Sequence, residues 1–369
     1  MAESKGNAKM PILLYRGEHF DSNFFYSSGV DLDHSFFLSN PRVLFVPKLN
    51  FTLARRLFSG RVIAYSNVSE VLGKFIRKKQ IRMLGTDFRS LPVSAYKKLS
   101  KLARLKDYSE QFLLVRAKKR KNEISKIRKA VQFSKKIFSE LESRIHHMKT
   151  ESDVRSFLLT RTLELGLEPA FEPITASGSN SRFPHYQSGN NAKLHDMVLV
   201  DYGVRYEHYC SDLTRCFFLK HGTKAEKTYL VMQEMFADII DNFPDFVSGK
   251  DLAVFTEKLY AKHSLPLPPH SIGHGIGLDV HEYPRLSKRY KDLLVGTTMA
   301  IEPSAYFNSF EKRSLRKPCT SVLGGAFFKS FALRPLKPLP LGCGGRMSKS
   351  FGVRFEETIE FNGKKAKVL

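Results

Sequence analysis

Residues 197–215, MVLVDYGVRYEHYCSDLTR, place two aspartates in what the sequence predicts to be a β-hairpin. Asp201 lies near the end of the apolar run that begins at Met197, Gly203 permits the backbone to bend, and Asp212 follows further along. A buried carboxylate is costly unless a cation or strong hydrogen-bond donors lie beside it, and two facing carboxylates raise one another's pKa or share a cation. The hairpin therefore predicts a cation site, with a solvated turn in which Asp212 pairs with Arg215 as the alternative.

Later motifs favour the cation site. HSIGHGIGLDVHE supplies three histidines, IEP supplies Glu302, and GVRFEE supplies Glu356. Two aspartates, two glutamates and one imidazole form a set that could hold two divalent ions, with carboxylates bridging them.

The order Asp, Asp, His, Glu, Glu in these local settings resembles the creatinase, aminopeptidase P and prolidase family of pita-bread metallopeptidases. The resemblance spans roughly residues 115–369. It implies five metal ligands, with Asp201 on one ion, His274 on the other, Asp212 and Glu356 touching both, and Glu302 completing the set.

The resemblance also implies catalytic residues around the metal ligands. Glu302 would move a proton from attacking water to departing amine, and Arg354 would organise the ligand carboxylates or meet the substrate. The outer histidines His185, His270 and His281 would contact the substrate or the tetrahedral intermediate. Considered alone, His185 is a loop residue of the kind usually found on the surface, and His270 and His281 could instead be neutral imidazoles satisfied in the core.

Oxygen-rich ligation with one imidazole suits two divalent ions, above all Mn²⁺, with Co²⁺, Zn²⁺ or Fe²⁺ as alternatives. A hydroxide held between two such ions can attack a scissile carbonyl. The resemblance implies an exopeptidase that cleaves Xaa-Pro bonds as a dipeptidase or aminopeptidase, and the compact length favours the dipeptidase. A methionine aminopeptidase-like enzyme and a non-catalytic family member that binds nucleic acid or protein are the alternatives.

The predicted fold class is α+β. We expect an N-terminal α/β domain of the creatinase type over 11–115 and a pita-bread catalytic domain over 116–369. Short β-type runs at 35–38 and 43–46 and helical stretches at 68–80 and 93–106 support the first domain. In the second, capping signals at Thr150 and Thr223 begin two helices, another starts after Gly249, and the pattern places helices on one side of an antiparallel sheet.

Two departures from the family pattern follow Glu302. Ser304 stands where the family usually has glycine after Glu-Pro, and 53 residues separate Glu302 from Glu356. The extra segment forms a basic insertion near 307–350, rich in Pro and Gly, which we interpret as a surface loop, with a lid over the cleft or a contact with a polyanion as the alternatives.

Basic residues lie mostly outside the stretch with the metal motifs. Residues 51–150 carry 26 basic and 7 acidic side chains, out of a formal net charge of +24 for the whole chain. Five of the basic residues lie in the run from Arg116 to Lys121, which we interpret as a solvated connection leading into a helix rather than as a nucleic-acid signal. A peptide substrate is therefore favoured over a nucleic-acid partner, although a basic surface attracts polyanions.

The location and assembly of the protein are expectations only. No run of eighteen apolar residues and no signal-peptide pattern occurs, which favours a cytoplasmic protein without a membrane partner. The resemblance implies a homodimer.

Overall fold

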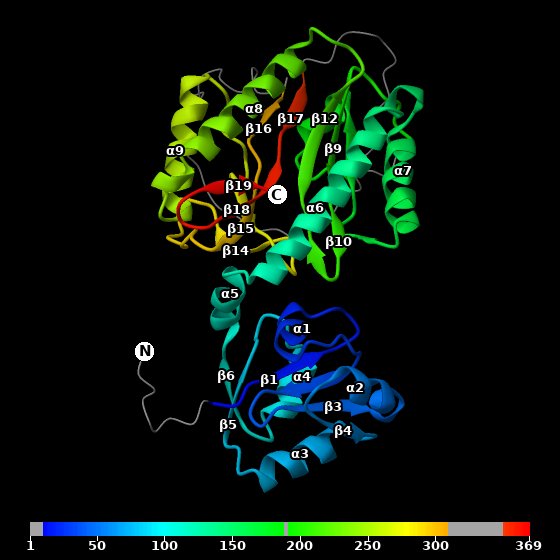
Figure 1. Ribbon diagram of the computed structural model, residues 1–369, viewed down its shortest axis with the longest axis vertical. Coiled ribbons are helices and arrows are strands. Elements are labelled where there is room, and N and C mark those ends of the chain that lie inside the picture. Colours follow the sequence, from blue (N-terminus) through cyan, green and yellow to red (C-terminus); the bar gives the residue numbers. More distant parts are fainter. Residues whose placement is uncertain (1–9, 188–190, 309–349) are drawn as a thin grey trace, which may run out of the picture.

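The computed structural model describes residues 10–187, 191–308 and 350–369. Its elements form two groups joined through one helix, α5 (Ser109–Ala117), as Figure 1 shows. Within the described residues, no helix is both long enough and apolar enough to cross a membrane. The predicted insertion near 307–350 lies outside the described residues except at its two ends.

The N-terminal group is a small α/β domain, as predicted. Four strands pair in chain order, and β5 runs parallel to β6 beside β1, to which an Ile12–Gly85 bridge connects it. The strands are β1 (Leu13–Arg16), β2 (Ser35–Leu38), β3 (Val43–Pro47), β4 (Arg61–Tyr65), β5 (Met83–Thr86) and β6 (Arg104–Asp107). The helices are α1 (Ser22–Ser28), α2 (Phe51–Leu57), α3 (Val68–Lys78) and α4 (Val93–Leu99).

The expectation of one helix over 93–106 is wrong in its second half. Helix α4 ends at Leu99, and the chain then forms β6. In this strand Leu105 is half-buried between the exposed Arg104 and Lys106, an alternation with the period of two typical of a β-strand.

The C-terminal group begins with two helices that cover a three-stranded antiparallel sheet. Helix α6 (Lys121–Glu142) and helix α7 (Glu151–Glu164) pack against β8 (Ile174–Ser177), β9 (Met197–Tyr202) and β12 (Leu213–Phe218). Thr150 caps α7 and forms the expected box with Asp153. A smaller sheet contains β7 (Glu168–Pro169), β10 (Val204–Tyr206) and β11 (Tyr209–Cys210).

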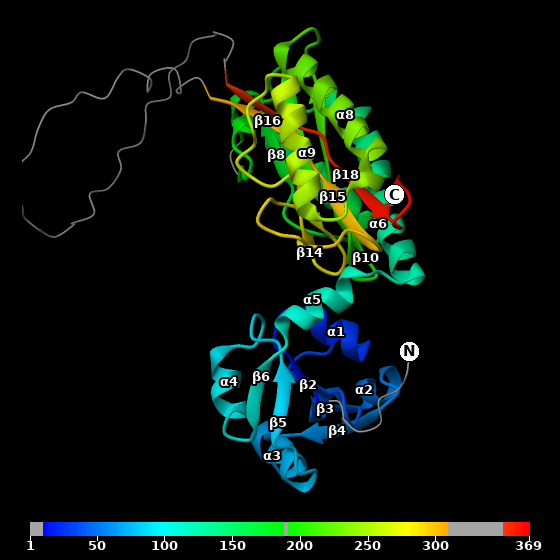
Figure 2. The same cartoon turned by 90° about the vertical axis from the view of Figure 1, so that its left-hand side faces the viewer.

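The second half of this domain repeats the arrangement, with helices α8 (Lys224–Asp241) and α9 (Gly249–Lys262) over a five-stranded sheet (Figure 2). The sheet order is β14-β13-β15-β18-β19. These strands are β13 (Gly273–Gly275), β14 (Glu282–Arg285), β15 (Thr297–Ile301), β18 (Glu357–Phe361) and β19 (Ala366–Val368), and a separate pair is β16 (Ser304–Phe307) with β17 (Phe351–Arg354). The structure confirms the helices predicted for this domain and the α+β class.

The predicted hairpin is also present, with Asp201 opposite Thr214 in the β9–β12 ladder. Gly203 follows β9 where the backbone of the opposite arm comes very close. A Cβ atom at Gly203 would lie 1.9 Å from the carbonyl oxygen of Ser211. Close approach, as well as the bend, therefore requires glycine at this position.

We expect Gly203→Ala to lower the free energy of unfolding by about 1–3 kcal/mol, because the two arms that carry Asp201 and Asp212 must separate to admit the methyl group. Urea denaturation of the full chain measures this change. Gly17→Ala is the matched control, since the nearest atom to its new Cβ would be a Tyr15 side-chain carbon at 3.4 Å. Equal stabilities of the two variants would contradict the steric argument.

Candidate metal centre

Five ionisable side chains meet between the two halves of the C-terminal domain. Asp201 lies on β9, Asp212 just before β12, His274 on β13, Glu302 just after β15, and Glu356 between β17 and β18. The four carboxylates are buried, with residue exposures of 2–8%. Each of two overlapping groups has its ligand atoms within 4.8 Å of one another, namely Asp201, Asp212 and Glu356, and His274, Glu302 and Glu356.

Arg354 supplies the positive charge inside this cluster. From β17 its guanidinium pairs with Asp201 and reaches Glu302 Oε2 at 3.5 Å, while its Nε donates to Thr214 Oγ1 at 3.0 Å. Thr214 donates in turn to Glu356 Oε2 at 2.6 Å. Arg215 also holds Glu356, by donating to its main-chain carbonyl at 2.7 Å. Arg354 and Thr214 thus orient three of the four carboxylates, as residues behind a metal ligand do.

Burial and crowding change the acidity of the carboxyl groups. Burial, followed by the charges of Glu356, Asp201 and Glu302, raises the pKa of Asp212 well above its usual value. Burial and then the Asp201 charge raise the pKa of Glu356 to about 7. The pKa of Glu302 is also raised, by burial and then by Glu356. One guanidinium therefore does not neutralise the cluster, and further positive charge would stabilise its ionised form.

Several oxygen and nitrogen atoms of the cluster are available as ligands for a cation. Asp201 Oδ1 and Asp212 Oδ1 are buried and have no hydrogen-bond partner among the described residues. Nδ1 of His274 faces the Gly275 carbonyl oxygen at 3.1 Å, so this nitrogen carries the hydrogen. Burial lowers the pKa of His274 to about 3, which leaves a bare Nε2 3.5 Å from Asp212 Oδ2. Two oxygens without partners and a nitrogen lone pair directed at a carboxylate fit a divalent ion.

The outer histidines that we expected from the sequence lie beside this cluster. His270 places Nδ1 3.7 Å from Glu302 Oε2 and accepts at Nε2 from Ser304 Oγ (3.1 Å) and Tyr306 Oη (3.2 Å). The His281 ring centroid is 4.1 Å from that of His274, with His281 exposed. His185 is exposed, and the pKa of both His270 and His281 is lowered, first by burial and to a smaller extent by the neighbouring His185.

Tyr306 is not among the site residues predicted from the sequence. This tyrosine lies two residues after Ser304 on β16, so both side chains point to the same face of the strand and both reach His270. The alternation of side chains along the segment EPSAY could have identified Tyr306, if His270 had already been placed beside Glu302. The serine that replaces glycine here gives His270 a hydrogen-bond partner.

A buried cluster of carboxylates and one imidazole, open to outer histidines, is the kind of centre found in metal-dependent hydrolases. Comparison with family models agrees with this class. Residues 125–362 match the model described as metallopeptidase family M24, and residues 13–118 match the creatinase/prolidase N-terminal domain. The chain belongs to metallopeptidase family M24.

Characterised and uncharacterised relatives share parts of the sequence. A Xaa-Pro dipeptidase of Pyrococcus horikoshii is 29% identical over 71% of this chain and 76% of its own length. An uncharacterized peptidase of Methanocaldococcus jannaschii is 32% identical over 54% of this chain and 59% of its own length, so the alignment spans less than two thirds of that relative.

Solved structures share the whole fold. An X-Pro aminopeptidase from Thermotoga maritima has a TM-score of 0.79 at 22% identity, over 97% of this chain and 94% of that one. A prolidase from Pyrococcus horikoshii has a TM-score of 0.76 at 24% identity, over 97% of this chain and 92% of that one. These likenesses establish the two-domain pita-bread architecture.

We expect Asp212→Asn to stabilise the metal-free protein at pH 8, by about 1–3 kcal/mol. A carboxyl group whose pKa is raised on folding destabilises the folded protein as the pH rises from the pKa of that group in the unfolded chain, about 4, through its pKa in the folded chain. The amide of asparagine does not titrate and therefore avoids this loss. Thermal unfolding with and without excess Mn²⁺ measures both effects: the ion should raise the Tm of the parent chain but leave that of Asp212→Asn nearly unchanged. A metal-free variant less stable than the parent at pH 8 would be the opposite result.

Proposed function

We propose that this protein is a dinuclear-metal exopeptidase that hydrolyses Xaa-Pro bonds in dipeptides or at peptide N-termini. The observation that carries the proposal is the convergence of Asp201, Asp212, His274, Glu302 and Glu356, with buried carboxylate oxygens that have no partner among the described residues. The substrate class is supported by the names of the similar proteins, a Xaa-Pro dipeptidase and an X-Pro aminopeptidase.

The residues that would hold the ions are these five. Two divalent ions, most simply Mn²⁺, would act as Lewis acids on the scissile carbonyl and lower the pKa of attacking water. Glu302 would lie beside the reacting groups, because Glu302 Oε2 is within 4 Å of both Arg354 Nη1 and His270 Nδ1. From there Glu302 can accept a proton from water and return it to the departing nitrogen.

His270 and Arg354 would orient the substrate. Burial lowers the pKa of His270 to about 4, so the ring is neutral, and its Nδ1 hydrogen points to the Ser271 carbonyl oxygen at 2.8 Å. Ser304 and Tyr306 hold the opposite nitrogen. His281, beside His274, and the exposed His185 would contact the substrate from outside the cluster. Proline substrates form a tertiary amide without an N–H, so recognition must come from such groups and from shape rather than from an amide donor.

The full chain with added Mn²⁺ should release proline from Xaa-Pro dipeptides, or the first residue from Xaa-Pro tripeptides, and comparison of the two separates dipeptidase from aminopeptidase. Asp212→Asn and His274→Ala should each lower kcat/KM by more than about 100-fold, since each removes a ligand. Asp196→Asn and His221→Ala are matched controls at exposed positions, and both should retain activity. Activity only on peptides with N-terminal methionine would favour a methionine aminopeptidase-like enzyme.

A second candidate function is binding of a nucleic acid by the N-terminal domain. Residues 51–107 carry 14 Lys or Arg and three acidic residues. Apart from Lys74 and Arg89, these cations have no carboxylate partner among the described residues, and all of them are exposed. Such a surface attracts polyanions and releases counterions on binding.

If this surface binds nucleic acid, the affinity for a fluorescent single-stranded RNA should fall about 10-fold or more between 50 and 200 mM salt. Replacing Arg77, Lys78 and Lys79 by glutamine should weaken binding and leave peptide hydrolysis unchanged. The control replaces Lys227, Lys250 and Lys258 of the catalytic domain by glutamine and should leave binding unchanged. Salt-independent or undetectable binding would remove this candidate.

A further inference from the structure

Two cations of the basic run 116–121 are buried. The side chains of Arg116 and Lys119 are 4% and 2% exposed, whereas Lys118 and Lys121 face solvent. The interpretation of this run as a solvated connection is therefore wrong for Arg116, in the last turn of α5, and for Lys119, between α5 and α6. Buried cations are expensive unless carboxylates compensate them, so their partners indicate their role.

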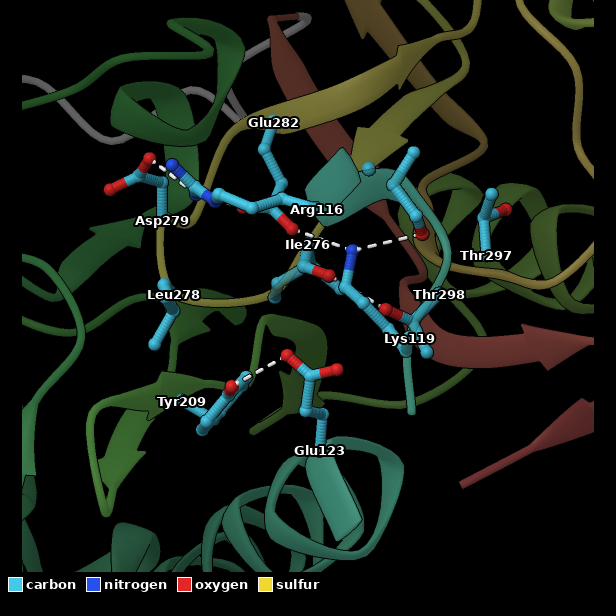
Figure 3. Close-up of polar contacts among 12 residues, drawn as sticks. Arg116, Lys119, Glu123, Tyr209, Ile276, Leu278, Asp279, Glu282, Thr297 and Thr298 are labelled. Atoms are coloured by element: carbon cyan, nitrogen blue, oxygen red, sulfur yellow. Dashed lines mark hydrogen bonds and ion pairs between the residues drawn. The ribbon is translucent and has the colours of Figure 1, made fainter. Parts of the chain in front are cut away.

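Both cations converge on Glu282, the residue that follows His281 (Figure 3). Lys119 Nζ lies 2.6 Å from Glu282 Oε1 and donates to the Ala117 carbonyl oxygen at 3.3 Å. The guanidinium of Arg116 pairs with the other oxygen of Glu282 and, at 2.7 Å, with Asp279 Oδ2. The Glu282 side chain is 3% exposed, so its pairs with Arg116 and Lys119 are buried, whereas the Asp279 side chain is 48% exposed at the edge of the cluster.

The backbone of the same loop is shaped around the Glu282 carboxylate. At Gly277 a Cβ atom would lie 2.1 Å from Glu282 Oε1 and 2.9 Å from Lys119 Cε. The loop is also tied to its neighbours, since Cys210 N donates to the Gly277 carbonyl oxygen at 2.8 Å and Thr298 Oγ1 donates to that of Ile276 at 2.6 Å. The loop 276–282, which comprises the connection after β13 and the first residue of β14, is thus held from several directions.

His281 has no comparable support of its own. Its ring makes no hydrogen bond with any described residue, and its closest described ring neighbour is His274, at 4.1 Å between centroids. The position of the ring over the metal ligand therefore depends on the backbone that carries it. Glu282 is the adjacent side chain, and its carboxylate is fixed by Arg116 and Lys119.

The cluster continues into the N-terminal domain. Arg116 Nη1 donates to Asn23 Oδ1 at 2.9 Å, and Asn23 Nδ2 donates to Asp87 Oδ2 at 2.6 Å. Ser22 donates to Asp279. The first turn of α1 is therefore connected through Arg116 to the loop beside the metal centre.

We infer that Arg116 and Lys119 are positioning residues for His281. They fix Glu282 and with it the loop 276–282, so that the docking of the N-terminal domain sets the place of the His281 ring over the substrate side of the centre. This inference rests on the proposed peptidase function for its kinetic consequence, but not for its structural one.

The kinetic test is a double-mutant cycle between Glu282→Gln and His281→Ala in the full chain with Mn²⁺. Glu282→Gln alone should lower kcat/KM on a Xaa-Pro substrate by about 10-fold or more, with metal content per chain unchanged. In a chain that already carries His281→Ala, Glu282→Gln should lower kcat/KM by less than about 2-fold, because the ring to be positioned is absent. Losses that multiply in the double variant, or no loss in Glu282→Gln alone, would overturn the inference.

The matched control is Asp292→Asn, which removes another buried carboxylate paired with an arginine. Asp292 accepts from Arg285 Nε at 2.7 Å at the end of β14 and is 7% exposed, but its partner lies outside the loop 276–282. This variant should leave kcat/KM within about 2-fold of the parent, and its effect should be the same with or without His281. An Asp292→Asn loss as large and as dependent on His281 as that of Glu282→Gln would also overturn the inference.

Hydrogen exchange measured by mass spectrometry tests the structural part without any turnover. In Lys119→Met, amides of 276–285 should exchange about 10-fold faster than in the parent, while the β9–β12 hairpin is unchanged. Lys119→Arg keeps the charge and should restore slow exchange. If the parent chain cleaves no Xaa-Pro peptide, the proposed function fails but faster exchange still supports the positioning role. Unchanged exchange in a folded Lys119→Met, or uniformly faster exchange in both Lys119 variants, would reject that role.

Discussion

The mutual repulsion of carboxylates in a cleft closed to water is the constraint on which this structure depends. Four carboxylates lie within a few ångströms of one another, and Arg354 is the buried cation among them. Burial and mutual repulsion raise the pKa of Asp212, Glu302 and Glu356, that of Glu356 to about 7. A folded chain tolerates such crowding only when the rest of its packing forces the groups together.

Two separate hydrophobic cores hold the carboxylates together. The hairpin with Asp201 and Asp212 is backed by α6 and α7, and the strands with His274, Glu302 and Glu356 are backed by α8 and α9. Strand β17 joins the two halves, because its Arg354 contacts Asp201 on one side and Glu302 on the other. The geometry of the centre is thus a property of how two sheets meet rather than of any one motif.

The sequence predicted much of the fold from local physical signatures, and the resemblance to a known family indicated the five residues that the structure brings together. Apolar runs that end in aspartate, helix caps at Thr150 and Thr223, and ordered motifs all have local signatures. Tyr306 was missed because its role depends on a strand face shared with Ser304. Arg116 and Lys119 were misinterpreted because their carboxylate partner lies more than 160 residues along the chain, and composition alone describes a basic run as solvated. Long-range pairing is what the local pattern does not encode.

The buried contacts of Arg116 limit how the two domains can be exchanged between proteins. Asn23, Arg116 and Glu282 come from three distant parts of the chain and form one connected set of charges and hydrogen bonds. A chimera that takes its N-terminal domain from another family member would keep the helix α5 yet lose the match across this junction. A graft that keeps these buried contacts must therefore carry all three positions together, so the domain boundary cannot be treated as a neutral cutting point.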